Sequence, residues 1–172
     1  TLSGTGDIEL TAATTKFKNS TSSAKVSVNG GNLDFEGTAT LGTLSLANGN
    51  VTTTGTTTAD VSALEWAGGN LNGKVKATST SLSGGNKTIG SAGELTVSGT
   101  LTTTGVGTIT NQGKFSKNGA GVTDLGAIFD STGTLAADLG TLKLSGGGKA
   151  SGNVTVASTG KLDVASAYTF EG

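Results

Sequence analysis

The amino-acid sequence predicts an all-β protein, a parallel β-helix or β-solenoid of roughly eight or nine coils with almost no α-helix. Three observations support this prediction. A short unit with alternating apolar residues recurs along the 172 residues, small polar spacers separate the units, and apolar residues at helical spacing are absent. Coils of about 20 residues, a common solenoid period, give the expected number of turns.

The recurring unit is Gly-x-Φ-x-Φ, where Φ is an apolar residue. Alternation with period two places both Φ side chains on one face of a strand and the intervening side chain on the other. The preceding glycine supplies the bend at which a strand begins, because glycine accepts positive φ at little cost. The copies lie at 6–10, 31–35, 42–46, 93–97, 140–144, 152–156 and 160–164, with near-copies at 24–28, 63–67 and 167–171.

Glycine, threonine, serine and asparagine make up more than half of the chain and fill the spacers, for example at 52–58 and 145–148. The closest approach to a helical apolar pattern runs from Val122 to Ile128, and Gly126 interrupts it. The distances between units are irregular. They predict short strands and turns but do not fix one period.

Many short strands suit either a two-sheet sandwich or a solenoid. A sandwich of this size needs bulky residues on two opposed faces, whereas this chain has no proline and only five Phe, one Trp and one Tyr. A parallel β-helix needs only narrow files of aliphatic residues, which stack about 4.8 Å apart. We therefore expect one β-solenoid module over residues 1–172.

The composition excludes several kinds of chemistry. Cysteine and histidine are absent, which rules out disulfides, thiol nucleophiles, imidazole metal sites and a Ser-His-Asp triad built from this chain. A formal charge of −1, with lysine as the only basic residue, does not fit a nucleic-acid-binding protein. No apolar run approaches 18 residues, so we expect no membrane insertion. Thr1 opens no signal sequence, and we expect an internal fragment of a longer repetitive protein.

Two stretches resemble a known family. Residues 111–172 and the segment LEWAGGNLNGKV at 64–75 are similar to the repetitive passenger regions of large bacterial surface adhesins related to filamentous haemagglutinin. The resemblance implies an exported, right-handed β-helix that forms a shaft or binding surface and has no catalytic residues. It also implies a tandem array, in which a passage like YTFEG at 168–172 precedes one like TLSGTG at 1–6.

Two pairs of carboxylates are candidates for chemistry. Asp7 with Glu9, and Asp34 with Glu36, each share the strand face opposite an apolar pair. Such pairs could perform acid–base catalysis on a glycan or hold Ca²⁺. We favour solvated outer-face residues, because GGNLD at 30–34 has the wrong spacing for a calcium-binding solenoid repeat.

Three further acids, Asp124, Asp130 and Asp138, could meet across one coil. Trp66 and Tyr168 occupy Φ positions, and we expect them in the core or at a coil end rather than stacked on a sugar. The sequence therefore predicts no catalytic, cofactor-binding or metal-binding residues.

The threonine runs at 52–60 and 101–108 raise the alternative of an ice-binding face, which needs a regular Thr-x-Thr array. The triplets here are irregular, so we interpret threonine as an outward-facing β residue.

The sequence favours a non-enzymatic structural segment of an extracellular bacterial adhesin, a stiff shaft that projects binding regions at the cell surface. The alternative is a module that binds polysaccharide or host matrix. A carbohydrate-active enzyme is a third hypothesis, because enzymes also occur on parallel β-helices. The expected partners are glycans, surface components of host or neighbouring cells, and neighbouring repeats of the same polypeptide. No cofactor is expected.

Overall fold

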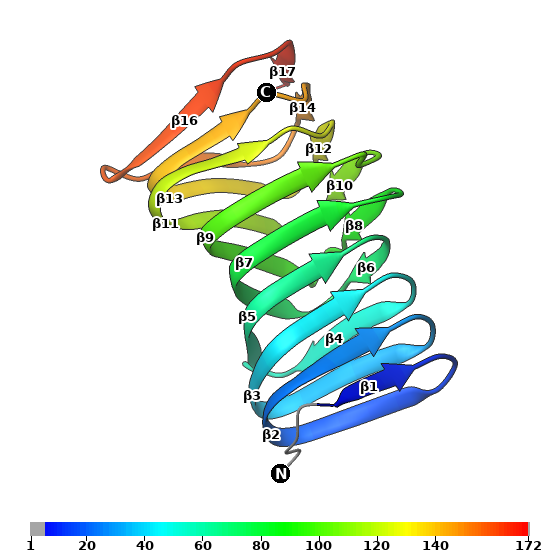
Figure 1. Cartoon of the computed structure of the whole chain (residues 1–172). Helices are drawn as coiled ribbons and strands as arrows, with labels where there is room; N and C mark the ends of the chain where they lie inside the picture. Colours follow the sequence, from blue (N-terminus) through cyan, green and yellow to red (C-terminus); the bar gives the residue numbers. More distant parts are fainter. Residues whose placement is uncertain (1–5, 172) are drawn as a thin grey trace.

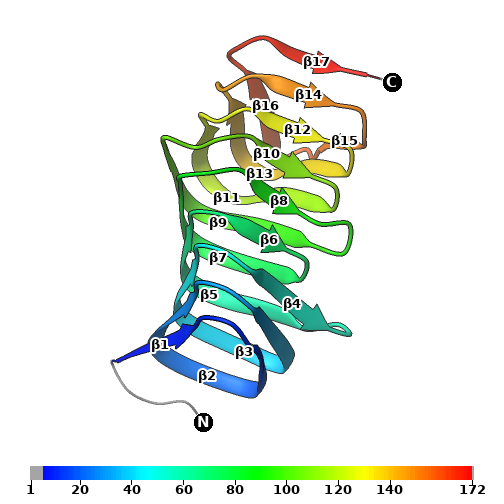
Figure 2. The ribbon, with the colours of Figure 1, turned by 90° about the vertical axis from the view of Figure 1, so that its right-hand side faces the viewer.

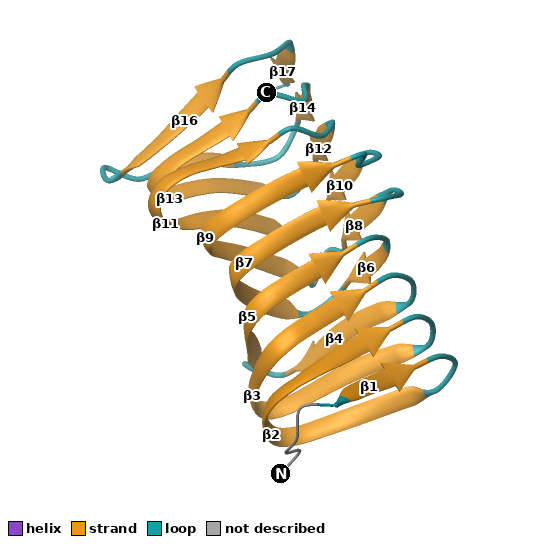
Figure 3. Cartoon of the chain, in the orientation of Figure 1, coloured by secondary structure: helices purple, strands orange, loops and turns teal. Residues whose placement is uncertain are grey.

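The computed structural model describes residues 6–171 and confirms an all-β chain. Residues 1–5 and Gly172, which belong to the segments that suggest a tandem array, lie outside the described residues. No helix occurs within 6–171 (Figure 3), and so none is available there to cross a membrane. The strands are β1 (Asp7–Leu10), β2 (Thr14–Val28), β3 (Asn32–Leu46), β4 (Asn50–Thr54), β5 (Thr58–Trp66), β6 (Gly69–Leu71), β7 (Lys74–Ser83), β8 (Lys87–Ile89), β9 (Glu94–Thr104), β10 (Ile109–Asn111), β11 (Lys114–Leu125), β12 (Phe129–Ser131), β13 (Thr134–Leu144), β14 (Gly148–Ala150), β15 (Val154–Val156), β16 (Gly160–Val164) and β17 (Tyr168–Phe170).

All these strands belong to one continuous sheet that coils about a long axis. Every strand pairing is parallel. The chain climbs in a right-handed sense and completes about nine turns (Figure 1). This confirms the predicted β-solenoid and rules out a sandwich of two antiparallel sheets.

Each full coil has three faces, named here in chain order. Face 1 contains β1, β16 and the C-terminal parts of β2, β3, β5, β7, β9, β11 and β13. Face 2, seen from the front in Figure 2, contains β4, β6, β8, β10, β12, β14, β17 and the N-terminal parts of β2 and β3. Face 3 contains β15, the central parts of β2 and β3, and the N-terminal parts of β5, β7, β9, β11 and β13.

Alternate side chains of every face point inward and build the core. On face 1, Val26, Leu44 and Leu64 lie one above another in register and are almost fully buried. Aromatic residues pack edge to face across successive coils or adjacent faces, as in the pairs Phe17–Phe35 and Phe115–Phe129. Because each coil buries its apolar residues mainly against its neighbours, the solenoid gains a dry core from a sequence with few large residues.

The length of a coil varies, and this explains the irregular spacing of the sequence motif. Thr58 pairs with Lys74, sixteen residues later, whereas Lys87 pairs with Ile109, twenty-two residues later. The Gly-x-Φ-x-Φ unit also occurs on all three faces: GDIEL lies on face 1, GNLDF on face 2 and GELTV on face 3. The first gap of 25 residues is therefore one coil of 18, from Asp7 to Lys25, plus a step of 7 to the next face at Asn32.

Stacked glycines form the tightest turns between face 1 and face 2. Gly31, Gly49 and Gly69 lie above one another, and each has a positive φ, from 71° to 107°. A Cβ atom on Gly69 would lie 2.6 Å from the carbonyl oxygen of Gly49. Only glycine fits this conformation and this close approach.

Candidate functional site

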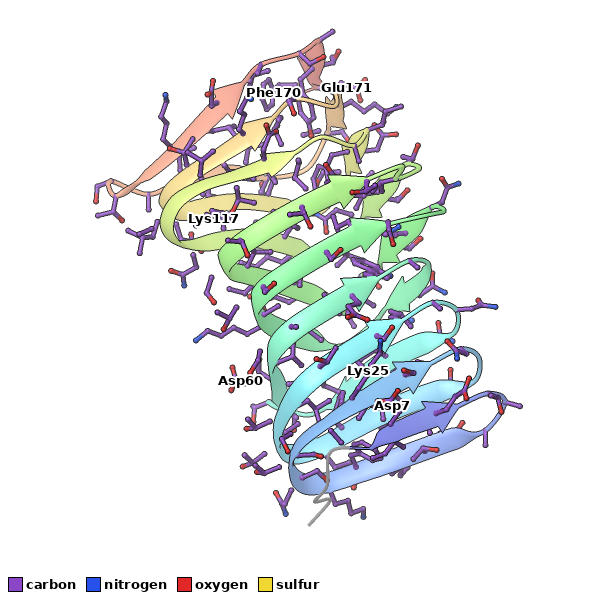
Figure 4. All side chains as sticks on the ribbon, in the orientation of Figure 1. Asp7, Lys25, Asp60, Lys117, Phe170 and Glu171 are labelled. Carbon is purple, nitrogen blue, oxygen red and sulfur yellow. The ribbon has the colours of Figure 1, made fainter. Side chains whose placement is uncertain are left out.

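The two acid pairs lie on the outer side of the solenoid, as expected, but their members contact side chains of other coils. The Glu9 carboxylate accepts a hydrogen bond from the Asn29 amide, while Asp7 pairs in register with Lys25 (Figure 4). Lys25 extends across two coils to the Glu65 carboxylate at 2.7 Å, and this hydrogen bond is the main cause of its raised pKa. These carboxylates bridge coils and do not converge on a common point.

Asp34 and Glu36 on face 2 are also engaged. Glu36 accepts hydrogen bonds from the ammonium groups of Lys16 at 2.8 Å and Lys18 at 2.9 Å, which hold its pKa below the usual value. Asp34 lies 3.6 Å from Lys16 and accepts a hydrogen bond from Thr52 in the next coil. The side chains of Asp34 and Glu36 are only 15% and 24% exposed, so they are less solvated than the sequence suggested.

The three acids from 124 to 138 do not meet. Asp124 lies on face 1, where it contacts Lys143 and Ser145 of the next coil. Burial acts to raise the pKa of Asp124, but hydrogen bonds from Ser145 and Lys143 and the charge of Lys143 outweigh it, and the pKa is lowered. Asp130 is on face 2, and Asp138 contacts Ser116 beyond the end of face 3. Among residues 6–171, no cluster of three or more acids could hold a metal ion.

Trp66 is a core residue, as its Φ position predicted. It is 1% exposed, and its indole Nε1 donates a hydrogen bond to the Gly68 carbonyl oxygen at 3.0 Å. Tyr168 is half-buried in the last coil, 5.1 Å from Phe170 between ring centres. Burial, followed by the charge of Asp130, raises the pKa of Tyr168 to about 12.

The two threonine runs do not form one array. Thr52 and Thr54 are on face 2, Thr58 begins face 3, and the 101–104 run is on face 1. Leu101 points into the core and Thr102 to the outside, so only alternate residues of a run share a surface. The outward polar order that does occur is an asparagine ladder on face 2, with side-chain bonds from Asn70 to Asn50 and from Asn50 to Asn32.

Two lysines lie inside the core, and sequence reasoning missed both. Lys87 is 1% exposed, and its ammonium group donates to the carbonyl oxygens of Ser83 at 2.6 Å, Gly85 at 2.8 Å and Ala67 at 3.2 Å. Lys117 is fully buried, and its ammonium group donates to the carbonyl oxygen of Gly119, with Ala120 and Leu139 further away. Burial lowers the pKa of each lysine.

A sequence signal for these lysines exists. Lys87 alternates with Ile89, and Lys117 alternates with Phe115, so period two places each ammonium on the side of the apolar residue. The usual rule that lysine faces solvent outweighed this signal. Each lysine instead neutralises carbonyl oxygens that turn inward where the coil changes direction.

A polar hollow lies on the outer side of face 3, around Asp60 (Figure 4). The three-residue turn after β4 extends beyond β3 and beyond the shorter β6–β7 turn (Figure 2), which leaves a ledge. Under it is a space of about 430 Å³, and a space of about 180 Å³ continues on the other side of Asp60. The lining residues are Asn19, Gly37, Thr38, Thr56, Thr57, Thr58 and Asp60 for the larger space, and Thr40, Asp60, Val61, Ser62, Lys76 and Thr78 for the smaller.

The charged groups of this polar hollow are unengaged. Asp60 and Lys76 are register neighbours on successive coils, yet within the described part of the chain neither has a hydrogen bond or an ion pair. At the rim, Asn19 has a left-handed backbone with φ of 46° and accepts a hydrogen bond from the Thr38 N–H. The Thr57 hydroxyl accepts a hydrogen bond from the Gly37 N–H at 2.9 Å, which anchors the ledge.

Comparisons of the chain with protein-family models, curated proteins and solved structures find no match.

Proposed function

We propose that this chain is a structural segment of an extracellular bacterial adhesin, a stiff shaft that holds binding regions away from the cell surface. The observation that supports the proposal best is the unbroken parallel ladder through about nine turns. Bending such a rod would separate backbone hydrogen bonds and core side chains between successive coils. At about 4.8 Å per coil, nine coils give a rod about 43 Å long.

The outer surface supports the same role. Most outward charges bridge neighbouring coils, as with Lys16 and Glu36, Lys114 and Glu94, and Lys143 and Asp124. A surface whose charges are engaged along the rod axis reinforces the stack and presents few groups to a ligand. This arrangement fits a spacer that positions other regions.

The shaft proposal can be tested by stiffness and by ligand binding together. Small-angle scattering should give the profile of a straight rod that does not change between low and high salt. A labelled chain should show no saturable binding on an array of glycans and matrix proteins. A profile that fits only a flexible ensemble would refute the shaft.

One observation favours a second function, recognition of a neutral saccharide at the polar hollow. Asp60 is free to accept hydrogen bonds from sugar hydroxyls, and Lys76 and the Asn19 amide can donate. The larger space is within the size range of small-molecule sites. One carboxylate beside one ammonium gives no net charge, which suits a neutral sugar better than an acidic one.

This second function predicts saturable binding of one class of neutral glycan, lost in Asp60→Asn. The matched control is Asp130→Asn, an outward acid on face 2 that accepts a hydrogen bond from the Lys149 N–H. Binding that survives Asp60→Asn would move the site away from the polar hollow, and a blank array would leave the shaft alone.

A further inference from the structure

The C-terminal end of the solenoid is an open core surface. The inward residues of the last coil have no coil above them, and Val156, Val164 and Phe170 are 50%, 41% and 50% exposed. Their counterparts one coil earlier, such as Leu144 below Val164, are 1–2% exposed. Figure 4 shows Phe170 at this end of the rod, with Asp7 at the other. The strands β15, β16 and β17 also carry backbone groups on an unpaired edge.

The opposite end has the complementary form. β1 pairs on one side only, with β2, and its inward residues Ile8 and Leu10 are partly buried. The N-terminal part of β2 likewise pairs only with β3 over Thr14–Lys18. Both ends therefore present a face 1 strand followed by a face 2 strand, in the same direction around the axis.

We propose that the C-terminal end binds the N-terminal end of a second copy of this chain, head to tail. β1 of the second copy adds to β16, and the start of its β2 adds to β17, as parallel strands. In this register Ile8 covers Leu162, Leu10 covers Val164 and Thr15 covers Phe170, so inward residues meet inward residues on both faces. The contact continues the coil-to-coil interface already present throughout the molecule.

The outward charges support the same register. Asp7 lies opposite Lys161, and Lys16 lies opposite Glu171, which gives two pairs of opposite charge. Neither Lys161 nor Glu171 has a hydrogen bond or ion pair within the described chain. One like-charged pair remains, Glu9 opposite Asp163, and Lys143 attracts Asp163 from the coil below.

The full chain should self-associate in sedimentation experiments as its concentration rises, and electron microscopy should show rods of constant width and multiple lengths. Two blocked variants give the decisive test: Val164→Lys with Phe170→Lys for the C-terminal end, and Ile8→Lys for the N-terminal end. Each alone should remain monomeric, and their mixture should form a dimer and nothing longer. The lysines at 164 and 170 start from exposed positions, so the monomer keeps its fold; circular dichroism verifies this for all variants.

A charge exchange tests the register without altering the core. Lys161→Glu should weaken association about tenfold, a loss that one reversed ion pair can produce, and adding Asp7→Lys should restore it. Val122→Lys, at an outward residue of face 1 that is 64% exposed, is the control and should associate like the native chain. A chain that stays monomeric at its solubility limit, or an Ile8→Lys variant that still dimerises, would overturn the proposal. Because shaft stiffness is measured on the monomer, failure here leaves the proposed function standing.

Discussion

Lys87 and Lys117 show how the core tolerates a charge without an acid. A buried ammonium loses its hydration, which is costly unless strong hydrogen bonds replace it. In both cases the replacement comes from backbone carbonyl oxygens at a turn. These oxygens would themselves be buried without donors if the lysine were removed, so the ammonium and the turn stabilise each other.

We expect Lys87→Met to lower the free energy of unfolding by about 1–3 kcal/mol, because the carbonyl oxygens of Ser83, Gly85 and Ala67 lose their donor. Urea unfolding followed by circular dichroism measures the change. Lys76→Met, at a solvent-facing position of face 3, is the control and should change stability little. A more stable Lys87→Met protein would mean that dehydration of the ammonium outweighs its hydrogen bonds.

The same lysines predict a dependence of stability on pH. Below their lowered pKa values both the folded and unfolded states are protonated, and the burial cost is fully present. Between those values and 10.5 the folded state releases protons that the unfolded state keeps, so the free energy of unfolding rises with pH. Above pH 10 Tyr168, with its pKa raised to about 12, reverses the trend, because its ionisation favours the unfolded state.

Urea unfolding between pH 8 and pH 12 should therefore show a maximum in stability. The double variant Lys87→Met, Lys117→Met should lose the rising part and keep the fall. An equally steep rise in the double variant would assign it to other groups.

Leu44 tests the inward face directly. It is fully buried between Val26 and Leu64, so Leu44→Asp would place an unpaired carboxylate in a narrow core. We expect a loss of about 4 kcal/mol or more, measured as a lower urea midpoint or as fragmentation in limited proteolysis. Thr43→Asp, one residue earlier and facing outward, is the matched control. A silent Leu44→Asp variant would contradict the assignment of the inward face.

Period-two alternation was sufficient to predict the orientation of Leu44 and Trp66, because a strand that buries one face fixes every second residue. The same alternation places Lys87 and Lys117 inward. Recognising them required knowledge of the carbonyl oxygens at the turns, and turn geometry depends on contacts between coils. The polar hollow around Asp60 was out of reach for the same reason, since its residues come from three coils.

Among the elements, the ladder around Asp34 joins neighbouring coils of face 2. Lys16, Asp34 and Thr52 belong to three successive coils, and Glu36 binds Lys16 and Lys18 below it. Ion pairs at a surface contribute at most about 1 kcal/mol each, so the ladder adds modestly to the core.

We expect Asp34→Ala with Glu36→Ala to lower the free energy of unfolding by about 1 kcal/mol, and high salt to reduce the difference. Thermal unfolding at low and high salt measures it. The single variant Glu65→Ala, which removes a more exposed ion pair to Lys25, should cost less. No loss at low salt would restore the view of Asp34 and Glu36 as freely solvated residues.

The sequence predicted that strands exist and where several begin, but it could not assign them to faces. GDIEL, GNLDF and GELTV are equivalent as local patterns, and only pairing with the coils on either side distinguishes face 1, face 2 and face 3. Coil lengths between 16 and 22 residues also prevent any fixed period from aligning them. Register is a property of neighbouring coils, which a local pattern does not contain.

On the scale of the whole molecule, the solenoid is a stack in which each coil contacts only its neighbours. Central coils have two neighbours and the end coils one, so unfolding should begin at the ends. We expect amide hydrogen exchange to be slowest in β5, β7 and β9 and fastest in β1 and β17, as followed by mass spectrometry of peptides. Uniform exchange across all coils would indicate a single cooperative unit.

The variable turns have an evolutionary consequence. Because every coil ends where the next begins and extra residues are accommodated at the corners, a coil can be gained or lost without disturbing its neighbours. Deleting residues 50–69 would join Gly49 to Asn70, whose strand already lies directly above Asn50. Recombination between such genes could therefore change the length of the rod one coil at a time.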